Sequence, residues 1–314
     1  MQRDFYAHGK LLISGEYLVL KGALALAVPT VYGQHLSATI EQKNADVINW
    51  TSFDNNGNKW FNATMDAKSL QVKGPLTGDK NIADTLRNII IAIRKQQPQY
   101  LLQGDINIST KLEFPNDWGL GSSATLLTNL CKHANADAMI VNAEVFKGSG
   151  YDIATAQANA PILFRIDDEG PVFDSVNFFP PQHEQFRFVH LGEKQNSRIA
   201  VEQFLDETKD KKLFNEIETI SEISEALLFC DDFSDFMQLL DDHEEMMQYV
   251  LQEEKIKTAR FNDFPGVVKS LGAWGGDFVL AAADMDGADI DTYFKEKGLH
   301  TVISYADMVL SAHA

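Results

Sequence analysis

The first 65 residues are rich in apolar and β-branched residues, a composition typical of β-strands. Four stretches are rich in apolar and β-branched residues and are separated by glycine or polar clusters: LLISGEYLVL, ALALAVPTV, QHLSATI and DVINWTSF. The DNNGN run at 54–58 predicts a tight turn. A further strand is expected over 105–114, where apolar side chains recur at every second position and Pro115 ends the run.

Helices are expected in three places, the first and third from apolar residues spaced three or four apart and the second from helix-forming residues without Gly or Pro. The first spans 79–97 and stops before Pro98, and the second begins near residue 122. The third covers 233–251, and its DDHEE run is expected to face solvent, opposite the apolar side. We expect His243, inside that run, to be solvated or packed between helices and to take no part in chemistry.

The pattern predicts both strands and helices along the chain, but periodicity alone does not give the fold. At 314 residues and 35.1 kDa the chain is long enough for two domains. The segment PPQHEQ at 180–185 interrupts the apolar pattern and predicts the boundary between them. We therefore expect one domain over 1–180 and a second over 181–314.

The charge balance narrows the choice of ligands. With 27 Lys and Arg against 45 Asp and Glu, the net charge of -18 disfavours binding to nucleic acid or to an anionic membrane. Any phosphate ligand must therefore meet a local positive potential. The only cysteines, Cys131 and Cys230, have no metal or redox spacing, which indicates a reducing, cytoplasmic compartment. No apolar run predicts a membrane span or a signal peptide.

The stretch FPNDWGLGSSATLL, residues 114–127, carries the first candidate chemistry. Glycines allow positive φ and close approach of an anion, and the helix that follows points unpaired N–H groups at it. Ser122 and Ser123 add hydroxyls for a phosphate or for Mg²⁺. The alternative is a tight turn capped by serine. No lysine follows Gly121 as in GxxxxGK[ST], so a lysine must come from elsewhere.

Lys10 and Asp152 are the candidates for proton and charge chemistry. Lys10 lies in AHGKLLISGEY, although a lysine considered alone is typically a solvated surface residue. Asp152 follows two glycines in GSGYDIA and could deprotonate a substrate hydroxyl, or it could cap the helix that follows.

Three motifs, read together, resemble the GHMP small-molecule kinases. AHGKLLISGEYLVLKGALALA, FPNDWGLGSSA and KSLGAWGGDFVLA occur in the family's order, near the start, the middle and the C-terminus. GEYLVL and GSGYD are similar to phosphomevalonate kinases, and the overall layout also fits mevalonate kinases. The resemblance implies an N-terminal α/β domain like that of a ribosomal protein, a C-terminal ferredoxin-like domain, and ATP with a small-molecule acceptor between them.

The resemblance also implies roles for individual residues. Asp152 and Lys10 would be catalytic, and Ser123 would be the Mg²⁺ ligand. The nucleotide would be bound by residues of the second and third motifs: Gly119, Leu120, Gly121, Ser122, Ser123, Ala124, Gly275 and Gly276. The acceptor would be bound by Glu16, Ser197, Arg198 and Lys269. An acceptor that is an alcohol would use Asp152 as a base or orienter, whereas a phosphate acceptor is already ionised and depends more on basic residues.

The sequence departs from the family pattern at several positions. His8 stands where proline is usual, and Trp274 replaces a small residue, where it would crowd a phosphate, fill a pocket or pack in the core. Glu144 lies near the position of the family's acidic metal ligand, but its spacing does not match. The main hypothesis is an ATP-dependent kinase acting on mevalonate or phosphomevalonate. A non-catalytic nucleotide- or metabolite-binding relative is the alternative, a sugar kinase is a third option, and a homodimer is left open.

Overall fold

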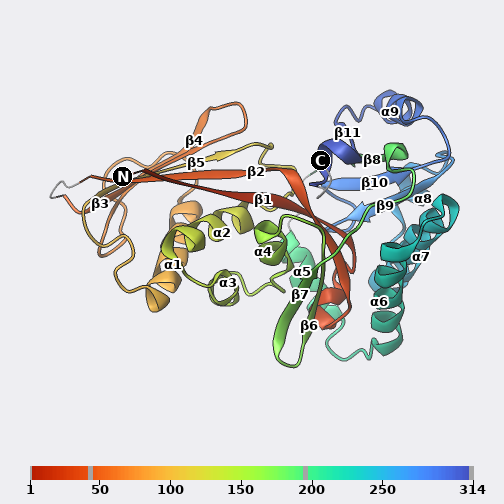
Figure 1. Cartoon of the computed structure of the whole chain (residues 1–314), viewed down its shortest axis with the longest axis horizontal. Helices are drawn as coiled ribbons and strands as arrows, with labels where there is room; N and C mark the ends of the chain where they lie inside the picture. The colour runs from red at the N-terminus through yellow and green to blue at the C-terminus, as the bar shows by residue number, and fades with distance from the viewer. Residues whose placement is uncertain (1, 42–44, 194–196, 311–314) are drawn as a thin grey trace. The chain divides into compact units, whose positions relative to one another are not determined.

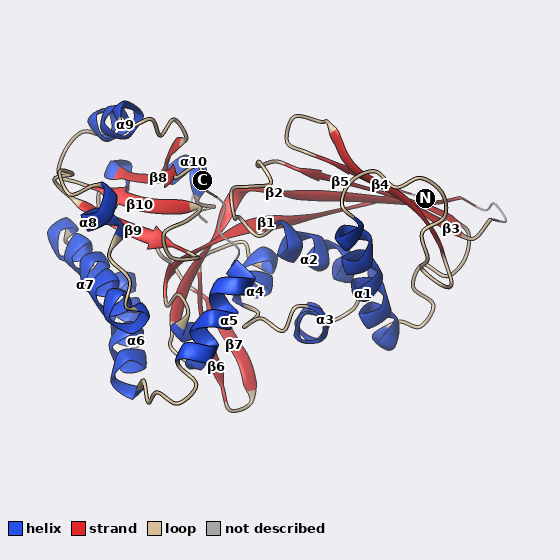
Figure 2. Cartoon of the chain, turned by 180° about the vertical axis from the view of Figure 1, so that it is seen from behind, coloured by secondary structure: helices blue, strands red, loops and turns tan. Residues whose placement is uncertain are grey.

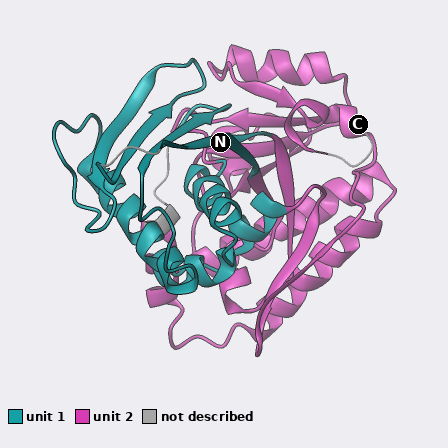
Figure 3. Ribbon diagram, turned by 60° about the vertical axis from the view of Figure 1, so that its left-hand side comes forward, with its two compact units in different colours: residues 1–9, 32–116, 120–157 teal, residues 10–31, 117–119, 158–314 magenta. Residues whose placement is uncertain are grey.

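The computed structural model describes residues 2–41, 45–193 and 197–310 of the chain (Figure 1). The chain forms two compact units (Figure 3). Unit 1 comprises residues 1–9, 32–116 and 120–157, and unit 2 comprises residues 10–31, 117–119 and 158–314. The expected domain boundary at 180–181 stays a prediction.

Unit 1 is a sheet with helices on one face (Figures 1 and 2). Its strands are β3 (Val47–Phe53), β4 (Lys59–Asp66), β5 (Asp105–Leu112), the later part of β2 (Ala25–Glu41) and the first part of β1 (Gln2–Ser14), which pairs with β2. Strand β3 pairs antiparallel with β4 and parallel with β5, and β5 pairs antiparallel with β2. The helices are α1 (Lys80–Gln96), α2 (Ser122–Ala134), α3 (Ala138–Val145) and α4 (Tyr151–Gln157).

The periodicity of α1 shows why these helices cover the sheet. Asp79 caps the helix by accepting a hydrogen bond from the Asn81 amide, and Leu86, Ile90 and Ile93 are buried on one side. They join Trp50 and other apolar residues of β3 and β4 in one core. This core fixes α2 and α4, which pack against each other, beneath the sheet.

Unit 2 contains a small hairpin and a second sheet. Strand β6 (Ile162–Asp167) pairs with the start of β2 and forms a hairpin with β7 (Gly170–Ser175). The later part of β1 (Gln2–Ser14) and the 3₁₀ helix η1 (Leu18–Lys21) also belong to this unit.

The second sheet has the strand order β11-β8-β10-β9, with every neighbouring pair antiparallel. Its strands are β8 (Phe186–His190), β9 (Val267–Leu271), β10 (Phe278–Ala282) and β11 (Val302–Ser304). Helices α5 (Ser197–Glu207), α6 (Phe214–Phe229), α7 (Phe233–Leu251) and α8 (Ile256–Arg260) connect β8 to β9. Helix α9 (Gly287–Glu296) connects β10 to β11, and the short η2 (His183–Gln185) and α10 (Tyr305–Met308) flank the sheet elements in sequence. This β-α-β-β-α-β arrangement confirms the expected ferredoxin-like region.

The strand expected over 11–20 is wrong in its second half. Strand β1 ends at Ser14, and the chain then turns through Gly15 at φ 92° and Tyr17 at φ 60° into η1. A Cβ on Gly15 would lie 2.6 Å from the Ala25 Cβ, so the turn needs glycine to pack against β2. The strands expected at ALALAVPTV and QHLSATI are one continuous strand, β2.

The prediction that the DDHEE run faces solvent is also wrong for two of its residues. Helix α7 has the predicted bounds, but His243 and Glu244 are 0% exposed. His243 is therefore not solvated, and its Nε2 contacts Gly15 and Glu16 of the turn after β1. Among the described residues, no helix is long and apolar enough to cross a membrane.

Candidate nucleotide and acceptor site

The glycine loop leads directly into α2. Gly119 and Gly121 have φ values of 66° and 86°, so both use the left-handed region that glycine tolerates. Helix α2 begins at Ser122 and has no acidic residue in its first turn. Its first amides and its dipole therefore favour an anion. Ser123 is exposed, whereas Ser122 donates a hydrogen bond to Asn116 Oδ1 at 3.3 Å.

The other predicted residues of this loop are buried. Leu120 is 0% and Ala124 is 2% exposed, so only their main-chain atoms could contact a nucleotide. Gly121 precedes the helix as its cap residue, and no serine side chain caps α2. The alternative of a turn capped by serine is therefore wrong here.

Lys10 and Gly119 meet within unit 2. Lys10 is half-buried, and its Nζ donates a hydrogen bond to the Gly119 carbonyl oxygen at 3.1 Å. It is therefore not a fully solvated surface lysine. Asp277 approaches the same glycine, because a Cβ on Gly119 would lie 2.2 Å from Asp277 Oδ2. A cation and a carboxylate thus both border this part of the loop, and only glycine fits between them.

Asp152 lies in unit 1, in the first turn of α4. It is half-buried, and its Oδ1 accepts a hydrogen bond from the Ile153 amide at 3.0 Å. Because α4 begins at Tyr151, Asp152 is inside the helix and is not its cap. Helix α4 packs against α2, the helix that begins with the candidate phosphate-binding serines.

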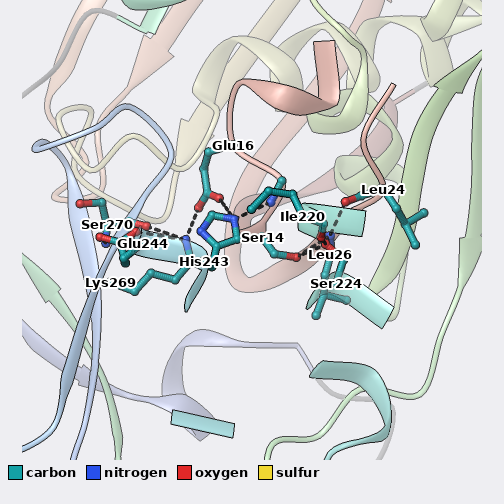
Figure 4. Close-up of polar contacts among 11 residues, drawn as sticks. Ser14, Glu16, Leu24, Leu26, Ile220, Ser224, His243, Glu244, Lys269 and Ser270 are labelled. Atoms are coloured by element: carbon teal, nitrogen blue, oxygen red, sulfur yellow. Dashed lines mark hydrogen bonds and ion pairs between the residues drawn. The ribbon is translucent and has the colours of Figure 1, made fainter. Parts of the chain in front are cut away.

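Glu16 and Lys269 lie together in a buried polar cluster of unit 2 (Figure 4). Lys269 Nζ is 2.7 Å from Glu16 Oε1 and 3.8 Å from Glu244 Oε1, and it donates to the Ser270 carbonyl at 2.9 Å. Glu244 Oε2 accepts a hydrogen bond from the Ser270 amide at 3.1 Å. The second oxygen of Glu16 is 3.1 Å from His243 Nε2. These contacts link the turn after β1 to α7 and β9.

The environment shifts the pKa of each acid and of the histidine in this cluster. Burial raises the pKa of Glu244 to about 8. Burial also acts to raise the pKa of Glu16, but the neighbouring Lys269 and His243 outweigh it and hold that pKa below its usual value. Burial and the charge of Lys269 lower the pKa of His243. At neutral pH, therefore, Glu16 is ionised, whereas Glu244 and His243 are uncharged.

The three residues Gly15, Glu16 and Tyr17 each contact a different part of unit 2. The Gly15 amide donates to His243 Nε2 at 3.0 Å, and Glu16 pairs with Lys269. The Tyr17 hydroxyl accepts a hydrogen bond from the Trp274 amide at 3.0 Å. Beside this turn, Ser14 and Ser224 share a hydrogen bond of 2.7 Å (Figure 4).

The third glycine loop joins β9 to β10 and contains Trp274. Gly275 has φ 72°, and the Gly276 amide donates to the Ala273 carbonyl at 3.2 Å. The indole of Trp274 is half-buried and its Nε1 donates to the Glu254 carbonyl at 3.2 Å. The Trp274 side chain thus links the third glycine loop by a hydrogen bond to the segment that follows α7.

The remaining candidate residues add little to a metal or acceptor site. Ser197 and Arg198 are the first residues of α5, and their side chains lie outside the described part of the structure. Glu144 forms an ion pair with Lys95, so its carboxylate is engaged on the surface of unit 1. Within the described ranges, no group of three or more His, Cys, Asp or Glu residues could hold a metal ion.

Sequence reasoning missed Asp277, Tyr17, His243 and Glu244. A signal was present for the last two, because Phe236, Leu240, His243 and Met247 follow helical spacing and Glu244 lies four residues after Leu240. The acidic composition of the run concealed that spacing. Asp277 directly follows the third glycine motif, but nothing local indicates that it reaches Gly119.

No known family model and no curated protein sequence matches this chain. Solved structures do match. Lin0012 from Listeria innocua has a TM-score of 0.74 at 14% identity and covers 96% of this chain and 97% of its own. Streptococcus pneumoniae phosphomevalonate kinase, in complex with phosphomevalonate and AMPPNP, has a TM-score of 0.70 at 16% identity; the match covers 96% of this chain and 99% of that kinase. L. major mevalonate kinase, in complex with R-mevalonate, has a TM-score of 0.66 at 16% identity; the match covers 99% of this chain and 97% of that kinase.

A Lactococcus lactis galactokinase complexed with galactose also matches, at 12% identity. Mevalonate kinases, phosphomevalonate kinases and this galactokinase are all GHMP kinases. The chain therefore has the two-domain fold of the GHMP kinases, as its three motifs predict.

Proposed function

We propose that this protein is an ATP-dependent kinase that transfers the γ-phosphoryl group to a mevalonate-pathway intermediate, mevalonate or phosphomevalonate. The observation that carries the proposal is the start of α2, where two left-handed glycines precede a helix with no acid in its first turn. Such a start suits the phosphates of a nucleotide. The similar phosphomevalonate kinase structure holds phosphomevalonate and AMPPNP, which supports the choice of both substrates.

The donor set near α2 fits Mg²⁺ bound mainly through the nucleotide. Ser123 offers an exposed hydroxyl oxygen, a hard ligand that Mg²⁺ accepts. Mg²⁺ usually keeps several waters and uses phosphate oxygens, so it needs no cage of protein carboxylates. When bound, the ion would neutralise charge on the transferred phosphoryl group.

Lys10 and Asp152 have separate roles in this proposal. Lys10 holds a positive charge at the Gly119 carbonyl, which supplies the local cation that a protein with a net charge of -18 needs for a phosphate ligand. Asp152 would accept the proton of an alcohol acceptor such as mevalonate. With phosphomevalonate the attacking oxygen is already ionised, so Asp152 would orient the acceptor instead.

The test is ATP consumption with Mg²⁺ against mevalonate, phosphomevalonate and galactose, with each product identified by mass. One phosphorylated product would support the kinase and name its acceptor. Asp152→Asn should lower kcat by about 10²–10⁴-fold for an alcohol acceptor while ATP binding is kept. Asp84→Asn, at an exposed position of α1, is the matched control and should leave kcat unchanged.

Three other outcomes would overturn the proposal. Nucleotide binding without turnover of any acceptor would favour the non-catalytic relative, and a product made only from galactose would favour a sugar kinase. Absence of nucleotide binding would contradict the assignment of the glycine loop itself.

A further inference from the structure

The buried cluster of Glu16, His243, Glu244 and Lys269 contains more ionisable groups than a simple ion pair needs. Glu16 is 3% exposed and the other three are 0% exposed. A buried charge is costly unless a partner compensates it. The protonation state of each member therefore decides whether the cluster is stable.

The surroundings of His243 indicate that its ring is neutral. Nε2 lies 3.0 Å from the Gly15 amide nitrogen and 3.1 Å from Glu16 Oε2, whereas Nδ1 is buried and has no hydrogen-bond partner among the described residues. An imidazolium would bury an unpaired N–H at Nδ1, so the neutral ring is the stable form. Lys269 is consequently the single cation of a cluster that contains two carboxyl groups.

The distances to Lys269 indicate which carboxyl group is ionised. Glu16 Oε1 is 2.7 Å from Lys269 Nζ, whereas the nearest Glu244 oxygen is 3.8 Å away. One ammonium balances one carboxylate, so the second acid is most stable with its proton. Burial, which raises the pKa of Glu244 to about 8, supports the same assignment.

The cluster lies between two of the three motifs. Glu16 belongs to the Gly15–Tyr17 turn, and Lys269 belongs to β9, which leads into the third glycine loop. Tyr17 contacts that loop through the Trp274 amide. Competition between two ionised glutamates for Lys269 would therefore disturb the turn and the loop together.

We propose that Glu244 is a positioning residue of the kinase: in its protonated form it leaves Lys269 to Glu16 and so holds the Gly15–Tyr17 turn against the third glycine loop. This inference rests on the proposed kinase function. Ionised Glu244 adds an uncompensated negative charge and draws Lys269 away from Glu16. Activity therefore depends on the protonation of Glu244, although this proton is not transferred to the substrate.

The pH dependence follows from every charged group that acts on Glu244. These groups are Lys269, Glu16 and Lys255, the last of which pairs at the helix surface with Asp241 and Glu245. The pKa of Glu244 is higher in the folded than in the unfolded chain, so its stabilising contribution is complete at acid pH and is lost as pH rises through about 8. His243 has a lowered pKa and contributes in the opposite sense, but only below its ordinary value.

The first experiment measures the thermal unfolding midpoint of the full chain between pH 6.5 and 9, for the natural protein, Glu244→Gln and Glu245→Gln. Glutamine matches the shape of a protonated glutamate and cannot ionise, and Glu245 is an exposed neighbour on α7. The midpoint should fall with rising pH in the natural protein and in Glu245→Gln, and it should stay level in Glu244→Gln. A fall in Glu244→Gln equal to that of the natural protein would overturn the assignment.

The second experiment measures kcat/KM over the same pH range on the acceptor found by the panel. Above pH 8 it should fall about tenfold per pH unit in the natural protein and in Glu245→Gln, and it should not fall in Glu244→Gln. Glu16→Gln should lower kcat/KM at every pH, because it removes the partner of Lys269. If Glu16→Gln, and not Glu244→Gln, abolished the fall of kcat/KM above pH 8, the titrating carboxyl group would be that of Glu16, and the proposal for Glu244 would be wrong. If no acceptor were turned over, the proposed function would fail while the unfolding series would still decide the charge state of the cluster.

Discussion

The glycine loop before α2 and the buried cluster around Lys269 use polar groups in opposite ways. The loop presents main-chain N–H groups at a helix start and an exposed Ser123 hydroxyl, groups that suit an outside ligand. In the cluster, Lys269 is 0% exposed and binds two partners within 3 Å, Glu16 and the Ser270 carbonyl. Substitutions in the loop should therefore cost ligand binding, whereas substitutions in the cluster should cost stability.

Lys269→Met tests the cluster side of this comparison and should have the largest effect on stability. It leaves the ionised Glu16 buried without its cation, which should lower the free energy of unfolding by about 3–5 kcal/mol. Denaturant unfolding measures the loss. The double variant Glu16→Gln/Lys269→Met removes both charges and should regain most of the stability. Unfolding curves that coincide for the single variant and the natural protein would contradict the role of the pair.

Gly119→Ala tests the loop side of the comparison. Alanine at φ 66° costs about 1–2 kcal/mol, and its Cβ would displace the Asp277 carboxylate. ATP affinity, measured by calorimetry, should also fall by about tenfold or ~1.4 kcal/mol. Gly57→Ala is the matched control, since Gly57 also has positive φ but has no atom within 4 Å of an added Cβ. Equal ATP affinity in the two variants would argue against a nucleotide at Gly119.

Tyr17→Phe should have a smaller effect. It removes the oxygen that accepts the Trp274 amide hydrogen, at a cost of about 1 kcal/mol. Hydrogen exchange at the Trp274 amide should become faster, while the amides of β9 stay protected. Tyr249→Phe, at a 64% exposed position of α7, should change neither quantity. Unchanged exchange in Tyr17→Phe would show that the third loop does not depend on the first motif.

Ser123→Ala should have the smallest effect on stability and so gives the sharpest contrast. Because Ser123 is exposed, the free energy of unfolding should change by no more than about 0.5 kcal/mol. The Mg²⁺ dependence of ATP binding should nevertheless weaken. Ser234→Ala alters another exposed serine at the second position of a helix and should leave both properties intact. Identical Mg²⁺ dependence in both variants would remove Ser123 as a metal ligand.

Local patterns predicted the glycine loop but not the cluster. Positive φ at Gly119 and Gly121 and the helix start at Ser122 depend on neighbours in sequence, so the motif alone indicated them. The same holds for α1 and α7, whose apolar spacing gave their bounds. Burial of Glu244, in contrast, depends on tertiary partners that an acidic run of sequence does not reveal.

Turns and strand lengths were the other difficulty. LLISGEYLVL contains enough apolar residues for one strand, but the close approach of Gly15 to Ala25 requires a turn after Ser14. Close packing against the next strand, β2, overrode the local β preference there. The same limit explains why Glu16 was assigned to the acceptor from its motif, although its carboxylate pairs with Lys269 inside unit 2.

The hairpin of β9 and β10 has a consequence for the order of folding. Its two strands pair directly, with Leu271 opposite Phe278, so the third glycine loop closes between residues that are near in sequence. The contact between Glu16 and Lys269 spans 253 residues and must close a far longer loop. Long-range contacts form slowly relative to local ones. We expect the hairpin to form early, and the turn that carries the first motif to dock on it only when the chain is nearly complete.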